Sequence, residues 1–299
     1  MKAVWSYWSR PIETHKEGNS WCQPIHHLLA WGISLRAAQR HYPDTVLVTD
    51  LAGRRLLVDK LGLAFSEVST ELERLRDVDP KWWALGKLVA YSLQDRPFLH
   101  IDTDVFLWNP LPPHVVNAPV FAQNPEYPAV HPLSYPYGPL DIERAFAAEG
   151  IELPLEWQSE RSRDDAYYPE ENCGIVGGNR TDFLRYYSGL ALDLVMNPRH
   201  RGAMARLGDK GYNMIVEQFL LAACVRYHRR NPDSPFKGVK ITHLFRGAHE
   251  AYEYQNSTRA GFTHLMCAKS HPAVGRRMEE RVKREDPAYF RQCEKLAAS

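Results

Sequence analysis

The chain has 299 residues, of which 44% are apolar, and its 37 Lys and Arg residues nearly balance 36 Asp and Glu residues for a formal net charge of +1. These values fit one large α/β domain or two small ones; they exclude global disorder, give no footprint for non-specific nucleic-acid or membrane binding, and leave no transmembrane segment. The start of the chain lacks signal-peptide features and the five cysteines are scattered, so we expect a cytoplasmic protein with reduced thiols.

The first third alternates strand-like and helix-like segments. Strands are predicted at residues 3–8, 45–49, 64–68 and 97–101 from their β-branched and aromatic runs. Helices are predicted between them: one carrying the apolar residues from Ile25 to Leu35, one over residues 54–61, and one capped by Asp79 with Pro80 in its first turn. This order predicts an α/β fold with a Rossmann-like, mostly parallel central sheet and helices on both faces.

After a proline-rich stretch over residues 111–139, strand-like and helix-like segments continue to alternate. Strands are predicted at residues 120–122, 172–179, 239–245 and 262–266, and helices at residues 141–149, 182–196, 211–228 and 274–296. A polar, charged loop over residues 158–169 contains Asp164 and Asp165 and is a candidate mobile lid. No internal repeat is evident, so the second half reads as an elaboration of the same sheet.

The Asp102-Thr103-Asp104 motif is the most informative feature of the sequence. It follows the apolar strand at residues 97–101, and in an extended chain side chains two residues apart point to the same side. Ligand clefts in α/β sheets open at the carboxyl ends of strands. Two adjacent carboxylates need a compensating cation, and Mg²⁺ or Mn²⁺ with oxygen ligands is the usual one, although a solvated turn gives the same pattern.

Four motifs occur in one order along the chain: Ile101-Asp102-Thr103-Asp104, Asn172-Cys173-Gly174, Glu217-Gln218, and the segment from His264 to Lys269. This order resembles the GT-A-fold glycosyltransferases, in particular the family of glycogenin and the bacterial lipopolysaccharide galactosyltransferases. The resemblance implies a single α/β domain that binds a nucleotide-sugar, with Mn²⁺ or Mg²⁺ on the diphosphate. It also implies a nucleotide-binding half over residues 1–110 and an acceptor and donor-sugar half over residues 111–299.

The resemblance also assigns roles to individual residues. It implies metal ligation by Asp102, Asp104 and the late histidine His264, with His243 as a competing histidine. The implied catalytic residues are Asn172, Glu217, Gln218 and Lys269, of which Lys269 also contacts phosphates, although the family motif is one residue longer there and contains a glycine. The implied residues around the nucleotide-sugar are Trp5, Ser6, Tyr7, Asp50, Lys87 and Thr103.

The sequence therefore predicts a metal-dependent glycosyltransferase that uses a nucleotide-sugar, most simply a UDP-sugar. The acceptor is open between a glycan, a peptide and a small molecule. Two alternatives of other classes are a nucleotidyltransferase and a non-catalytic nucleotide-sugar or glycan-binding protein. Residues 5–11 contain no glycine, which disfavours the Gly-rich phosphate loop of a nucleotidyltransferase.

Overall fold

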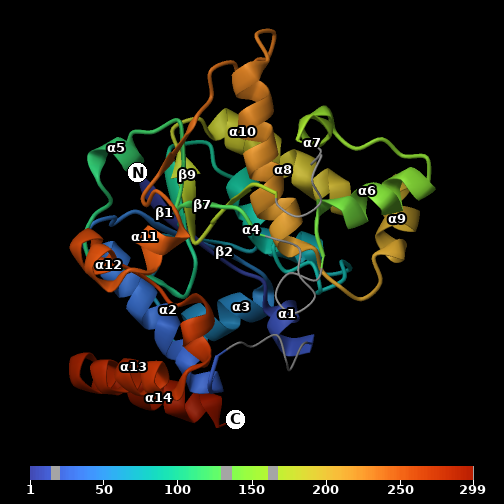
Figure 1. The fold of residues 1–299 in the computed structure, drawn as a ribbon. Helices are drawn as coiled ribbons and strands as arrows, with labels where there is room; N and C mark the ends of the chain where they lie inside the picture. Colours follow the sequence, from blue (N-terminus) through green and yellow to red (C-terminus); the bar gives the residue numbers. More distant parts are fainter. Residues whose placement is uncertain (15–20, 129–136, 161–167, 299) are drawn as a thin grey trace.

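A computed structural model of the chain describes residues 1–14, 21–128, 137–160 and 168–298. Its centre is a seven-stranded sheet in the order β10-β6-β9-β4-β1-β2-β3, which gives the predicted α/β architecture (Figure 1). The strands are β1 (Lys2–Tyr7), β2 (Thr45–Thr49), β3 (Glu67–Ser69), β4 (Phe98–Ile101), β6 (Val120–Ala122), β9 (Ile175–Gly178) and β10 (Ile241–His243).

The sheet is mostly parallel. β1 pairs in parallel with β2 and β4, β2 with β3, and β10 with β6. β9 alone of these strands runs antiparallel, and it does so to both of its neighbours, β4 and β6. The strands predicted at residues 64–68 and 239–245 are wrong at their bounds, since pairing is confined to residues 67–69 and 241–243.

Helices cover both faces of the sheet. One layer holds α2 (Pro24–Gln39), α13 (Pro272–Glu285) and α14 (Pro287–Ala297), and the other holds α4 (Leu85–Ser92), α8 (Thr181–Met196) and α10 (Leu220–Arg230). Neighbouring residues of β1 show why two cores form: Val4 packs into the α4 side, while Ala3 and Trp5 pack into the α2 side. The sheet is thus buried on both faces, as its apolar strands require.

Shorter helices fill the connections. They are α1 (Ser9–Thr14), α3 (Leu51–Arg54), α5 (Pro113–Val116), α6 (Pro139–Ala148), α7 (Leu155–Ser159), α9 (Arg201–Arg206), α11 (Ala248–Tyr252) and α12 (Tyr254–Ala260). Five further segments have π or 3₁₀ geometry: η1 (Arg55–Lys60), η2 (Glu71–Leu75), η3 (Pro198–His200), η4 (Ile215–Phe219) and η5 (Met266–Ser270). The predicted helix over residues 211–228 is therefore a π turn, η4, followed by α10.

Two helix predictions are wrong in ways that local chemistry explains. The Asp79 side chain accepts a hydrogen bond from the Lys81 amide at 3.0 Å and makes a turn there, so the helix begins only at Leu85. The single helix predicted over residues 274–296 is two helices. Pro287 stops the first, and the Asp286 carboxylate caps the second by accepting from the Tyr289 amide at 2.9 Å.

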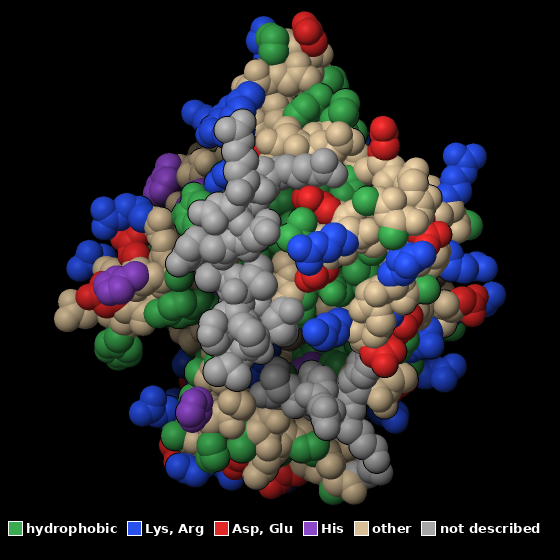
Figure 2. All heavy atoms as spheres, turned by 45° about the vertical axis from the view of Figure 1, so that its right-hand side comes forward, with side chains coloured by type: hydrophobic (Ala, Val, Ile, Leu, Met, Phe, Trp, Pro, Cys, Tyr) green, Lys and Arg blue, Asp and Glu red, His purple; other side chains and the backbone are tan. Residues whose placement is uncertain are grey.

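Two small antiparallel ladders stand beside the central sheet and shape the site. β11 (Phe262–His264) pairs with β5 (Val105–Leu107), and β8 (Glu170–Glu171) pairs with β7 (Pro125–Glu126). Within the described part of the chain, no helix is long and apolar enough to cross a membrane. Basic and acidic side chains are interspersed on the face drawn in Figure 2, as the near-neutral net charge leads one to expect.

Candidate metal centre

Asp102, Asp104 and His264 come together at the carboxyl end of β4. β4 ends at Ile101, and the Val105 amide donates to the Asp102 carbonyl at 2.9 Å, which turns the chain into β5. His264 lies directly opposite Val105 in the β5–β11 ladder, so the ladder register brings it to the turn. One potential ligand atom from each of the three side chains lies within 4.8 Å of the others.

The orientation of His264 suits metal ligation. Its Nδ1 lies 2.7 Å from Gln123 Oε1, which orients the ring so that Nε2 lies 3.6 Å from Asp104 Oδ1, and the neutral ring would offer the Nε2 lone pair to a bound metal. Gly174 makes room for this pair, because a Cβ at that position would lie 2.5 Å from both His264 and Gln123. Two oxygen ligands and one imidazole nitrogen form a donor set that fits Mn²⁺ or Mg²⁺ with further positions open to phosphate.

Asp104 is also bound by Lys269. The ammonium lies 2.8 Å from Asp104 Oδ2. Burial alone would raise the pKa of Asp104, but attraction to His264 and Lys269 outweighs it and leaves the pKa well below its usual value. Asp104 is therefore ionised.

Met266, with φ of 41° in the left-handed region, turns the chain between His264 and Lys269 where a glycine would be usual.

Lys87 lies behind Asp102 and is buried, rather than exposed on a helix surface. Its Nζ lies 3.0 Å from Asp102 Oδ1, 2.8 Å from Glu217 Oε1 and 3.1 Å from the Cys173 carbonyl. An ammonium group has three donors, so these three acceptors use all of them. Burial would lower the pKa of Lys87, but Asp102 and Glu217 outweigh burial and raise it, so the ammonium stays charged. Lys87 holds Asp102 in place and has no donor left for a phosphate.

Glu217 and Gln218 lie on the π turn η4, a geometry that often marks functional sites. Glu217 is fully buried and accepts from the Tyr91 hydroxyl at 2.8 Å as well as from Lys87. Gln218 is 9% exposed, and its Oε1 has no hydrogen-bond partner. Glu217 therefore holds Lys87 and Tyr91 behind the metal cluster. Gln218 Oε1 is an acceptor that no described residue uses.

Both polar groups of the Asn172 side chain are hydrogen-bonded within the protein. Its Oδ1 accepts from the Gly174 amide at 3.0 Å and its Nδ2 donates to Glu126 Oε1 at 2.9 Å. Asn172 thus fixes the turn that places the Gly174 carbonyl 3.0 Å from the Asp102 amide. It also orients Glu126, a carboxylate in the proline-rich stretch that sequence reasoning missed because glutamates in such stretches are usually solvated.

The other residues predicted to bind the nucleotide-sugar differ in their burial and in their contacts. Trp5 is fully buried and donates to Ser34 Oγ at 3.0 Å, and Asp50 caps α3 by accepting from the Gly53 amide at 2.7 Å. Ser6 Oγ lies 2.9 Å from His100 Nε2, two residues before Asp102. Tyr7 packs edge-on against Trp31 in the core.

Thr103 lies in the turn between Asp102 and Asp104 and is partly exposed. The structure thus brings Ser6 and Thr103 near the carboxylates, and it places Trp5, Tyr7 and Asp50 in packing or capping roles.

His243, the competing histidine, is not part of the cluster. Its Nε2 lies 2.6 Å from Glu171 Oε2, in the β8 strand. Gln123 is a second residue that the sequence did not reveal, because its role depends on β6 lying next to β9 in the sheet. The predicted lid, including Asp164 and Asp165, lies largely outside the described residues.

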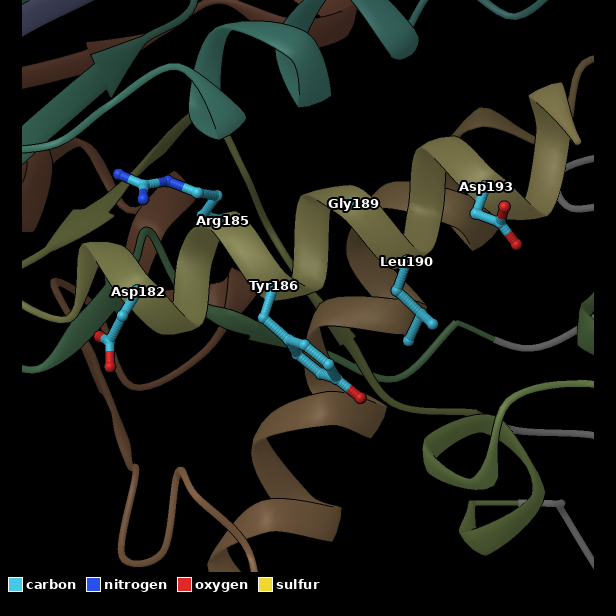
Figure 3. A pocket seen from close by; sticks show the side chains of 6 residues that line it. All are labelled: Asp182, Arg185, Tyr186, Gly189, Leu190 and Asp193. Carbon is cyan, nitrogen blue, oxygen red and sulfur yellow. The ribbon is translucent and has the colours of Figure 1, made fainter.

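A separate open groove runs along α8. Figure 3 shows Tyr186 and Leu190 pointing to one side of the helix and Arg185 to the other. The groove is lined by Asp182, Arg185, Tyr186, Gly189, Leu190 and Asp193. None of these residues belongs to the metal cluster.

The chain matches, over residues 1–296, a family model described as "Family of unknown function (DUF6734)", and it belongs to that family. No curated protein matches its sequence. An active-site mutant of LgtC is similar at 15% identity and a TM-score of 0.30, with 71% of this chain and 72% of that chain covered. The apo form of mouse xyloside xylosyltransferase 1 is similar at 9% identity and a TM-score of 0.37, with 90% and 98% covered.

Proposed function

We propose that this protein is a metal-dependent glycosyltransferase of the GT-A type that takes a sugar from a nucleotide-sugar, most simply a UDP-sugar. The observation that carries the proposal is the Asp102–Asp104–His264 cluster, with ligand atoms within 4.8 Å of one another and the Lys269 ammonium 2.8 Å from Asp104. The cluster stands at the end of a parallel strand, where α/β sheets bind ligands.

The chemistry of the residues supports this choice. Breaking the bond between the anomeric carbon and the diphosphate oxygen develops negative charge on the leaving phosphate. A divalent ion at the cluster would neutralise part of that charge as a Lewis acid. Lys269 can transfer its hydrogen bond from Asp104 to a phosphate oxygen, since it is the partly exposed cation of the site, at 23% side-chain exposure against 10% for Lys87. Gln218 offers an amide next to the reacting sugar, where an oxocarbenium-like centre forms.

The test is donor turnover by the purified protein. We expect Mn²⁺ and UDP together to raise the melting temperature, and one member of a UDP-sugar panel to be consumed with release of UDP only when Mn²⁺ or Mg²⁺ is added. A nucleotidyltransferase would instead release pyrophosphate from UTP and a sugar 1-phosphate. Binding of UDP-sugar without any release of UDP, with or without candidate acceptors, would favour the non-catalytic binding protein.

A further inference from the structure

Two glutamates face each other in the β7–β8 ladder, and no cation among the described residues pairs with either of them. Glu126 and Glu170 are direct cross-strand partners. Like charges in such positions destabilise a ladder unless something compensates them. Within the described ranges, the Glu126 side chain accepts from two neutral amides, Asn172 Nδ2 at 2.9 Å and Asn124 Nδ2 at 3.3 Å. Glu170 is 1% exposed, and neither of its carboxylate oxygens has a hydrogen-bond partner in the part of the chain that the structure describes.

This acidic pair adjoins the candidate metal centre. Glu170 lies two residues before Asn172, and the turn that follows places the Cys173 carbonyl on Lys87 and the Gly174 carbonyl on the Asp102 amide. Among the described residues, four side chains from β8, η4 and the residue before β7 carry buried oxygens with no hydrogen-bond partner: Asn124 Oδ1, both oxygens of Glu170, Glu217 Oε2 and Gln218 Oε1. Buried acceptors without partners beside two carboxyl groups suit a cationic hydrogen-bond donor, which would favour the charged form of both carboxyl groups.

We propose that the Glu126–Glu170 pair is a subsite for a primary ammonium group on the acceptor, so that the acceptor is a hydroxylated amine; this rests on the proposed function. An ammonium brings three donors and one positive charge, whereas a hydroxyl brings one donor and leaves the charge uncompensated. A second divalent metal fits less well. Among the described residues, the one group of three close metal-ligating side chains is Asp102, Asp104 and His264.

Binding of an ammonium group at this subsite is coupled to release of a proton from Glu170. Burial, and then the charges of Glu126 and Glu217, raise the pKa of Glu170 well above its usual value. The charged and titratable groups around it are Glu126 from β7, Glu217 from η4 and Tyr137. The empty subsite therefore favours the protonated form of Glu170 more than water does. An arriving ammonium favours the carboxylate, so Glu170 gives one proton to solvent and amine affinity rises with pH towards neutrality.

The experiment measures binding of glucosamine and N-acetylglucosamine by calorimetry at pH 7, with and without saturating Mn²⁺ and UDP. The two probes share their hydroxyls, but only glucosamine carries an ammonium. We expect at least ten-fold tighter binding of glucosamine, with proton release seen as a dependence of the heat on buffer ionisation enthalpy. Glu170→Gln and Glu126→Gln should each remove the preference, and Glu152→Gln, at an exposed position, should keep it.

The outcomes separate the two proposals. Equal affinity of the two probes, or a preference that survives both Glu126→Gln and Glu170→Gln, overturns the ammonium subsite even where Mn²⁺ and UDP bind. A glucosamine preference that depends on Glu170 but occurs without any binding of Mn²⁺ and UDP supports the subsite and contradicts the proposed function. Because glutamine is close to the shape of a protonated glutamate, Glu170→Gln should keep its melting temperature at pH 7, which shows that a lost preference is not a folding defect.

Discussion

Lys87 and Glu217 form an ion pair 2.8 Å apart in which the Glu217 side chain is fully buried. The same ammonium lies 3.0 Å from Asp102, so this pair ties the metal cluster to the π turn η4. A buried cation shared by two carboxylates holds both in one geometry, and removal of the cation leaves two buried charges without compensation.

Lys87→Met should therefore destabilise the fold as well as the site. We expect a loss of about 3–5 kcal/mol in the free energy of unfolding, the range for breaking a buried pair. Urea denaturation measures it, with Lys240→Met at an exposed position as the matched control. A loss equal to that of the control would mean that Asp102 and Glu217 do not depend on Lys87.

Asp104→Asn should abolish Mn²⁺-dependent UDP binding while the fold stays intact. The amide loses the charge that pairs with His264 and Lys269, but it keeps the shape of the carboxylate. Calorimetry with and without Mn²⁺ measures the effect, and circular dichroism checks the fold. Undiminished metal-dependent binding would remove Asp104 from the metal shell.

His264→Ala should lower turnover far more than His243→Ala. His264 belongs to the cluster through its place opposite Val105, whereas His243 is paired with Glu171 at 2.6 Å. Steady-state rates at saturating donor and Mn²⁺ compare the two variants, with melting temperatures as the folding control. Inactivity of His243→Ala alone, at unchanged melting temperature, would contradict the assignment.

Lys269→Ala should depress kcat by on the order of 10²-fold and raise the donor KM less. A cation that binds the departing phosphate acts most strongly in the transition state. Lys237→Ala, at an exposed position, is the control for loss of a positive charge. A kcat within a factor of two of the parent would leave Lys269 as a partner of Asp104 only.

Acid should destabilise the protein partly through His27. Burial, and then the charge of Lys269, lower the pKa of His27 from 6.5 to about 4. Between these values the unfolded chain binds a proton that the folded chain refuses, so stability falls as pH drops from 6.5 to 4, by about 3 kcal/mol for this group. His27→Gln, which keeps an acceptor for the Trp31 indole, should show a correspondingly smaller loss in denaturation at pH 7 and pH 4. His249→Gln, at an exposed position, should behave like the parent.

The sequence by itself determined the strand that ends at Asp102 and the same-side placement of the two carboxylates, because strand propensity and the two-residue repeat are local. It also determined most strands of the central sheet and most of the long helices that cover it. It misplaced the start of α4 and missed the break at Asp286, where side-chain hydrogen bonds and a proline override the apolar pattern.

Only the tertiary structure decided which histidine joins the carboxylates and which residues support them. His264 reaches Asp104 through the β5–β11 ladder, and Gln123 reaches His264 through the order β6-β9-β4 in the central sheet. Lys87 is a buried cation because α4 brings it against Glu217 of η4 and against Asp102, and Glu126 lies opposite Glu170 because β7 pairs with β8. These partners are far apart along the chain, and no local propensity specifies pairs that only packing and strand register bring into contact.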